Sequence, residues 1–263
     1  SQLGGTGGAG VPIPAGAGGL SGGGSGGNEE LARECRTTAD VEGNVACEIV
    51  AVVNSLDAYW SDAFARSGQT LPLPETTYFS GGVNTGGCGS ASSGVGPFYC
   101  PADSGIYIDL TFFDELENRF GAQGGPFARA YVMAHEYGHH IQNVLGTNRR
   151  VQPGETGPTS GSVRLELQAD CYAGVWGNHA MTTPGPSGDP LITEVNQADV
   201  AAALDTAARI GDDFIQSQLG GGRVDESQFS HGSSAQREFW YTRGLDTGDP
   251  AACDTFARGV DLG

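Results

Sequence analysis

The chain has 263 residues, which is enough for one domain with a buried core or at most two small ones. It carries 31 acidic and 13 basic residues, a formal net charge of −18, and every basic residue is an arginine. A surface this acidic repels nucleic-acid phosphates, and no stripe of basic residues interrupts it, so the sequence excludes nucleic acid as a partner.

Residues 1–27 are rich in glycine and other small residues, as in GGTGGAG and SGGGSGG. Such a segment has too few apolar side chains to offset the entropy lost on ordering, so we expect a flexible linker. Residues 28–263 are expected to form one domain. No stretch approaches the roughly 18 apolar residues of a membrane span, and no signal-peptide pattern stands at Ser1. We therefore expect a mature or trimmed product, with any membrane anchor upstream of it.

In the first half of this domain, apolar residues recur at helical spacing over residues 44–66, and Gly68 ends the helix that they predict. A passage rich in Pro, Gly and Ser follows to about Gly96 and is expected to be irregular. Residues 106–110 alternate as in a half-buried strand, which we expect at the edge of a sheet. Two further helices are predicted, over residues 111–120 and over residues 127–145, where Gly146 stops the second.

The second half is predicted to be helical. After a loop over residues 147–161, a helix is expected to begin at Ser162 as its N-cap and to continue to about residue 180. Another is expected over residues 196–219, ended by the glycines at 220–222. Ser233 and Gln236 have capping-box spacing for a helix through Tyr241, and a last helix is predicted over residues 249–259. The fold class is therefore mainly α (α+β), with a small sheet.

The chain contains six cysteines, at Cys35, Cys47, Cys88, Cys100, Cys171 and Cys253. Because none of them forms a CxxC pair, a thiolate zinc site or a thioredoxin-type centre is not expected. Short loops favour disulfides between Cys35 and Cys47 and between Cys88 and Cys100, which leaves Cys171 for Cys253. The alternative is that Cys171 is a buried free thiol. If the disulfides form, the chain belongs to an oxidising, extracytoplasmic compartment.

The motif HEYGH in the helix over residues 127–145 indicates a metal site. His135 and His139 are four residues apart, so both imidazoles leave the same helix face and can reach one zinc ion. Glu136 lies off that shared face but close enough to take a proton from a zinc-activated water. The alternative, two solvated surface histidines, is disfavoured by the apolar turn that precedes the motif.

A catalytic zinc requires a third protein ligand. The extension HExxHxxGxxH is excluded because Gln142 and Leu145 stand where it requires glycine and histidine. Glu166 and Asp170 lie one turn apart on the helix expected to begin at Ser162. We predict Glu166 as the ligand and Asp170 as the acceptor of the outer N–H of a ligating histidine, with Asp170 as the alternative ligand. A solvated helix face is the other interpretation, which the apolar neighbours of both acids disfavour.

Three further histidines remain. His140 and His179 are expected to be structural, the first because it points away from the shared face and the second because it lies near a helix end. His231 precedes the Ser233 cap and is predicted to stabilise the charge that develops on the attacked carbonyl, with Arg237 as possible support for the transition state. The competing interpretation makes His231 an ordinary residue of a capping loop.

Several segments together resemble the neutral zinc metallopeptidases of bacteria, from about residue 30 to the C-terminus: GPFYCPAD, YIDLTFFDEL, AYVMAHEYGHHIQ, RLELQADCYAGVW, HGSSAQR and CDTF. The ELQAD segment is also similar to the ExxxD segment of glutamate zincins, which supports Glu166. The resemblance implies a zincin-like metallopeptidase domain over residues 28–263, with substrate paired to the strand over residues 105–110. Members of the family typically have a membrane span before a glycine-rich linker, which implies tethering.

The expected function is thus that of a zinc-dependent metallopeptidase acting on a peptide or protein substrate, with Glu136 as general base. Two other interpretations stay open. One is a non-catalytic binding module of the cell envelope that keeps its metal for structure, which an intact Glu136 disfavours. The other is an amidase that acts on cell-wall peptides through the same site.

Overall fold

The computed structural model describes residues 34–92, 96–185 and 188–263, so the linker predicted over residues 1–27 lies outside the described residues. The helices are α2 (Val45–Arg66), α3 (Phe112–Asn118), α4 (Pro126–Leu145), α5 (Gly161–His179), α6 (Gln197–Arg209), α7 (Asp212–Phe214) and α8 (Ser234–Thr247). The strands are β1 (Glu75–Tyr78), β2 (Gly82–Asn84), β3 (Ser90–Ser92), β4 (Phe98–Cys100) and β5 (Gly105–Ile108). This mainly helical arrangement with a small sheet confirms the predicted α+β class.

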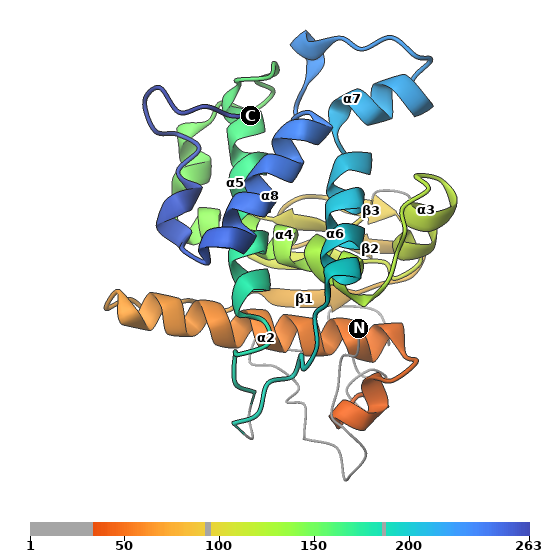
Figure 1. Ribbon diagram of the computed structural model, residues 1–263, viewed down its shortest axis with the longest axis vertical. Helices are drawn as coiled ribbons and strands as arrows, with labels where there is room; N and C mark the ends of the chain where they lie inside the picture. The colour runs from red at the N-terminus through yellow and green to blue at the C-terminus, as the bar shows by residue number, and fades with distance from the viewer. Residues whose placement is uncertain (1–33, 93–95, 186–187) are drawn as a thin grey trace.

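The helix predicted over residues 44–66 forms as α2, and the side chain of Asn44 caps it by accepting the backbone N–H of Cys47. In Figure 1, α2 runs below the sheet, while α5, α8 and α6 stand upright in front of it, with α8 between the other two. A bidentate ion pair joins α2 to α4, because Arg129 donates from Nε to Glu48 Oε2 at 2.8 Å and from Nη2 to Oε1 at 3.1 Å. Helix α4 therefore lies between α2 on one side and α5 and α6 on the other.

The three-stranded sheet has the order β1-β5-β4, which corrects two expectations. Strand β5 is central rather than an edge, because it pairs with β1 in parallel and with β4 antiparallel. All four residues of β5 are buried, so the alternation over residues 106–110 did not mark a solvated face. Both sides of β5 are occupied, and pairing of substrate with residues 105–110 is therefore wrong.

The passage expected to be irregular up to Gly96 contains three strands. Strand β1, with the sequence ETTY, was missed because its polar residues do not alternate with apolar ones. Three of its four residues are nevertheless buried. Strands β2 and β3 pair as an antiparallel hairpin, which the disulfide between Cys88 and Cys100 joins to β4. Short strands between turns leave little periodicity to detect in a sequence.

Helix α4 ends where the sequence predicted. Pro126 occupies its first turn, and Gly146 ends it in the left-handed region with φ 76°. Helix α5 begins earlier than expected, because Ser160 and not Ser162 is its N-cap: the Ser160 hydroxyl accepts the backbone N–H of Val163. Two serines near a helix start offer the same chemistry, and only the backbone geometry distinguishes them.

Helices α5 and α8 cross at a point where both carry glycine. A Cβ on Gly174 would collide with the carbonyl of Tyr241, and one on Gly244 would collide with the carbonyl of Cys171. The backbones therefore approach as closely as glycine permits. The disulfide between Cys171 and Cys253 fastens α5 to the segment after α8 at the same place.

The continuous helix expected over residues 196–219 is broken instead. Helix α6 ends at Arg209, Gly211 is extended with φ −69° and ψ 148°, and α7 and a π turn (Ile215–Leu219) follow. The break is tertiary in origin, because a Cβ on Gly211 would meet the backbone of Ser234 at 2.5 Å. Helical spacing persists on both sides of the break, so the sequence pattern did not reveal it.

The capping box of Ser233 and Gln236 forms as predicted, but α8 continues past Tyr241 to Thr247 and ends at Gly248. The helix predicted over residues 249–259 is reduced to a short 3-10 turn at Pro250–Cys253. Other 3-10 turns lie at Thr38–Val41, Thr147–Arg150 and Glu226–Gln228.

The three predicted disulfides form: Cys35–Cys47, Cys88–Cys100 and Cys171–Cys253. The alternative of a free thiol at Cys171 is therefore wrong. Three bridges are typical of a chain that folds in an oxidising environment. Among the helices of the described residues, none has the length and apolar character that crossing a membrane requires.

Candidate metal centre

His135, His139 and Glu166 place their ligand atoms around one point. The Nε2 atom of His135 lies 3.1 Å from Nε2 of His139 and 3.1 Å from Oε2 of Glu166, and His139 Nε2 lies 3.4 Å from Glu166 Oε1. Atoms bound about 2.0 Å from a tetrahedral zinc ion are separated by roughly 3.3 Å. Of the described residues, only this trio forms a group of histidine, cysteine or acidic side chains able to hold a metal ion.

The close approach of α4 and α5 brings the three ligands together. The fourth residue of the motif is Gly138, and a Cβ there would lie 3.0 Å from both Cα and the carbonyl oxygen of Ala169. A larger residue would push the helices apart and separate Glu166 from the histidines. Sequence reasoning did not single out this glycine, although its place inside HEYGH was a usable signal.

Asp170, predicted to accept from a ligating histidine, contacts the outer ring nitrogen of His135. The Nδ1 atom of His135 lies 2.8 Å from Asp170 Oδ1, so its proton is donated there and Nε2 is left with a lone pair for the metal. The Tyr131 hydroxyl donates to the same oxygen at 2.5 Å. Asp170 is fully buried, and the imidazole ring of His135 that donates to it therefore has one fixed orientation.

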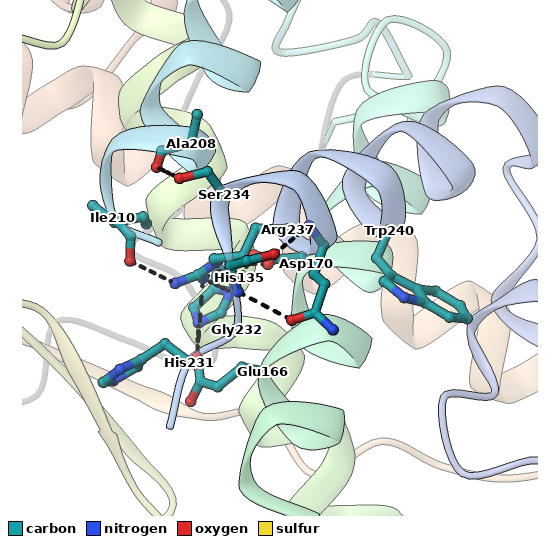
Figure 2. A network of polar contacts seen from close by, with 12 residues as sticks. His135, Glu166, Asp170, Ala208, Ile210, His231, Gly232, Ser234, Arg237 and Trp240 are labelled. Atoms are coloured by element: carbon teal, nitrogen blue, oxygen red, sulfur yellow. Dashed lines mark hydrogen bonds and ion pairs between the residues drawn. The ribbon is translucent and has the colours of Figure 1, made fainter. Parts of the chain in front are cut away.

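Arg237 supports Asp170 together with Tyr131, whose hydroxyl oxygen lies 3.4 Å from Arg237 Nη2. Its Nε donates to Asp170 Oδ2 at 2.8 Å and its Nη2 to Oδ1 at 3.0 Å, while Nη2 also lies 3.9 Å from Glu166 Oε2. Figure 2 shows the guanidinium at the centre of the network, with a further contact to the Ile210 carbonyl. Only 2% of Arg237 is exposed, so its contacts favour positioning of Asp170 over direct support of a transition state.

His139 has a different and neutral support, which sequence reasoning missed. Its Nδ1 donates to Gln142 Oε1 at 2.9 Å, and the Gln142 amide donates to the Leu165 carbonyl and to Gln168 Oε1. Gln168 in turn donates to the carbonyl of Cys253 at 3.0 Å. Gln142 follows His139 by three residues, which places both on one helix face, and this spacing was the available signal.

The electrostatics of the site favour positive charge between the ligands. Burial lowers the pKa of His135, but Asp170 and Glu166 outweigh it and raise that pKa to about 10. Burial raises the pKa of Glu166, but His139 and His135 outweigh it and hold that pKa well below its usual range. Both outer ring nitrogens have acceptors, and the two Nε2 atoms lie 3.1 Å apart beside Glu166, so a bound cation would take the place of the proton that the raised pKa of His135 otherwise holds there.

Glu136 lies beside the ligands and lines the same cleft, whose volume is about 490 Å³. Burial raises the pKa of Glu136, and the nearby His135 and His139 oppose that rise. A carboxylate whose pKa is raised toward neutrality is a stronger base than an ordinary glutamate. Its place between the metal ligands and the open cleft suits proton transfer.

His231 also lines the cleft, with 53% of its side chain exposed. Its Nδ1 lies 3.1 Å from Asp212 Oδ1, and that hydrogen bond raises the pKa of His231. Asp212 Oδ2 accepts the backbone N–H groups of Ser230, His231 and Gly232 at 2.7–2.9 Å. Asp212 was missed because it stood inside a helix that was expected to be continuous.

The two histidines predicted to be structural have structural contacts. His140 Nε2 donates to the Pro72 carbonyl at 2.6 Å, so its Nδ1 accepts from the Tyr99 hydroxyl at 2.9 Å. His179 lies 2.8 Å from the Gly248 carbonyl. Neither residue lines the cleft.

The chain matches the profile of the family described as "Putative neutral zinc metallopeptidase" over residues 11–256. It is 50% identical over 231 residues to an uncharacterized protein of Mycobacterium tuberculosis, an alignment covering 88% of this chain and 76% of that relative. It is 44% identical over 206 residues to the uncharacterized protein YpfJ of Escherichia coli, covering 76% and 68%. No solved structure matches the chain. Because the family match spans both helices that carry the candidate ligands, the chain belongs to the neutral zinc metallopeptidase family.

Proposed function

We propose that the chain is a zinc-dependent peptidase that hydrolyses peptide bonds. The observation that carries this proposal is the convergence of His135, His139 and Glu166 at tetrahedral spacing, with Glu136 beside them in an open cleft. Two histidines, one carboxylate and an open position are the arrangement of catalytic rather than structural zinc sites.

Zinc bound by these three residues would polarise the scissile carbonyl and lower the pKa of a water molecule toward neutrality. Glu136 would serve as the general base that takes a proton from the attacking water and passes it to the leaving amine. Asp170 holds the Nδ1 proton of His135, and Gln142 holds that of His139, so both rings keep Nε2 turned inward.

His231 is proposed to donate a hydrogen bond to the oxyanion as the carbonyl is attacked. Asp212 supports this role because it fixes Nδ1 of His231 and, through three backbone N–H groups, the loop that carries the ring. The ring is half-exposed in the cleft, so its Nε2 is accessible to a substrate. Arg237 is proposed to act through Asp170 and not on the substrate.

The substrate backbone is proposed to run along β4 instead of β5. In the described part of the sheet β4 pairs with β5 only, and its residues Phe98 and Tyr99 line the cleft. The Tyr99 hydroxyl is held by Asn143 and His140 of α4, which fixes the strand relative to the metal ligands. An extended peptide can therefore gain main-chain hydrogen bonds beside the zinc site. The three disulfides support an oxidising, extracytoplasmic compartment for this activity.

Glu136→Gln separates chemistry from metal binding. We expect this variant to keep its zinc, measured by elemental analysis, and to lose peptide cleavage by at least about a hundredfold, the scale of a lost general base. Glu166→Ala should instead lose zinc, because it removes a ligand. The exposed Glu194→Gln serves as the matched control and should change neither.

Chelator-sensitive cleavage of ordinary peptides by the wild-type chain would support the proposal. Cleavage confined to cell-wall peptides would support the amidase interpretation, and zinc binding without any cleavage would support a binding module. Full turnover by Glu136→Gln would rule out Glu136 as the base.

A further inference from the structure

The cleft is lined by two chemically different sets of side chains, which we call its polar half and its apolar half. The polar half contains the metal ligands, Glu136, His231 and the edge of Arg237. The apolar half is lined by six side chains: Phe112, Leu116, Phe120, Val132, Ile210 and Ile215. Among the described residues that line the cleft, every group able to carry charge lies in the polar half, although the chain as a whole has a net charge of −18.

The apolar half is a built cavity wall, because polar contacts brace the segments that form it. Arg209 of α6 donates from Nη1 to the Phe120 carbonyl at 3.0 Å, and Asp205 accepts the backbone N–H of Gln123 at 3.0 Å. These contacts hold the segment that follows α3 against α6. On the other side, the Phe112 ring lies so close to Gly96 that a Cβ there would be 3.0 Å from it.

The apolar half also adjoins the reacting groups. Val132 precedes Glu136 by four residues on α4 and His135 by three, so its side chain lies one turn before both and neighbours each of them. Val132 is 6% exposed and contributes to the cleft, so the wall begins one turn from the proposed base. A side chain that enters this half must belong to a residue flanking the bond under attack.

We propose that this half is a subsite that selects a large aliphatic or aromatic side chain, such as leucine or phenylalanine, on a residue next to the scissile bond. This inference rests on the proposed function, which it deepens by naming a substrate class. Transfer of such a side chain from water into an apolar pocket is favourable, whereas a charged side chain would lose its hydration without gaining a partner there. We therefore expect no preference for basic side chains at this subsite, although the surface of the chain is acidic.

Binding of small zinc-directed probes tests the subsite without turnover. We would measure the affinity of the zinc-loaded chain for hydroxamates of N-acetylated leucine, phenylalanine, alanine and lysine by calorimetry. The leucine and phenylalanine probes should bind roughly ten- to a hundredfold more tightly than the alanine probe, and the lysine probe should bind no better than alanine. Peptides with varied residues beside the scissile bond should show the same order in kcat/KM.

A charge introduced into the wall should change this order. Ile215→Asp should weaken binding of the leucine probe and strengthen binding of the lysine probe. The ratio of the two affinities should change by at least about tenfold. Val224→Asp, at a valine that is 44% exposed and outside the cleft, is the matched control and should leave the ratio unchanged. Thermal unfolding checks that both variants are folded. If Ile215→Asp does not fold, Ile215→Ala replaces it, and this variant should weaken binding of the leucine probe several-fold.

The outcomes separate the subsite from the proposed function. Equal binding of all four probes, or a ratio that Ile215→Asp and Ile215→Ala leave unchanged, would overturn the subsite while peptide cleavage still supported a peptidase. Binding of the expected order without cleavage of any peptide would support the subsite and contradict the peptidase. Failure of every hydroxamate to bind would overturn both, because it would show that the zinc site does not accept a ligand.

Discussion

Two buried aspartates flank helix α4, and each accepts a hydrogen bond from a tyrosine of that helix. Asp170 lies on the α5 side and accepts from Tyr131, His135 and Arg237. Asp57 lies on the α2 side and accepts from Tyr137 at 2.7 Å, while its other oxygen has no donor among the described residues. The two carboxyls are similarly removed from water, with 0% and 7% exposed.

The difference lies in the charge that each environment permits. Burial raises the pKa of Asp170, but Arg237 and His135 outweigh it, so that pKa lies below its usual value. Burial raises the pKa of Asp57 to about 7, and the Tyr137 hydroxyl only partly opposes the rise. The side of α4 that faces the metal site thus maintains a negative charge, which steers His135, whereas the other side holds an acid that is neutral below pH 7.

Removing the counter-charge of Asp170 should have the largest effect. Arg237→Met leaves a fully buried carboxylate without its cation, so we expect a loss of about 3–5 kcal/mol in the free energy of unfolding, measured by denaturant titration. Arg243→Met, at an exposed arginine of the same helix, is the control and should cost less than about 1 kcal/mol. The double variant Arg237→Met, Asp170→Leu removes both charges and should recover much of the loss. A cost below 1 kcal/mol for Arg237→Met alone would contradict the charged state assigned to Asp170.

The sequence could predict one of these aspartates and not the other. Asp170 was predictable because its partners follow from local spacing: His135 belongs to HEYGH, and Asp170 lies one turn from Glu166 on a single helix. Periodicity likewise placed α2, while the stop at Gly146 and the capping box at Ser233 placed α4 and α8. Asp57 pairs with Tyr137 across 80 residues, and no pattern near either residue indicates the contact.

The same limit explains the errors in the fold and in the site. The break after α6 depends on the packing of Gly211 against Ser234, and the central place of β5 depends on a β1 that has no alternation of its own. Asp212, which holds His231, became a candidate only once that break was known. Local chemistry therefore predicts the ligands, while tertiary contacts decide what supports them.

Asp57 should make the stability depend on pH. The folded chain holds this proton more tightly than the unfolded chain, in which an aspartate titrates near pH 4. The stabilisation from the protonated carboxyl is therefore complete below about pH 4 and is lost as the pH rises through about 7. Three pKa units correspond to at most about 4 kcal/mol.

Asp57→Asn isolates this contribution, because the amide oxygen still accepts from Tyr137 but the side chain does not titrate. Relative to wild type, the variant should become progressively more stable as the pH rises from 4 to 8, measured by denaturant titration under one metal condition. Asp62→Asn, at an exposed position on the same helix, is the control and should follow wild type. Parallel curves for Asp57→Asn and wild type would show that Asp57 is ionised throughout.

The two tyrosines give the finest comparison, with expected effects of about 1–3 kcal/mol. Tyr137→Phe removes the only donor to Asp57 among the described residues. A hydrogen bond to a charged acceptor is worth roughly twice one to a neutral acceptor, so the cost should be about 1 kcal/mol at pH 5 and about 2–3 kcal/mol at pH 8. Tyr131→Phe removes one of the three hydrogen-bond donors to Asp170, which is ionised at both pH values.

Tyr131→Phe should therefore cost about 1 kcal/mol at pH 5 and the same at pH 8, because Arg237 and His135 continue to compensate Asp170. The quantity to compare is the change in each cost between the two pH values, measured by denaturant titration of both variants beside wild type. A pH-dependent cost for Tyr131→Phe together with a constant cost for Tyr137→Phe would reverse the assignment of charge on the two sides of α4. The expected pattern is a constant cost for Tyr131→Phe and a pH-dependent cost for Tyr137→Phe. It would support a buried negative charge that is maintained at both pH values only on the side of α4 that faces the metal site.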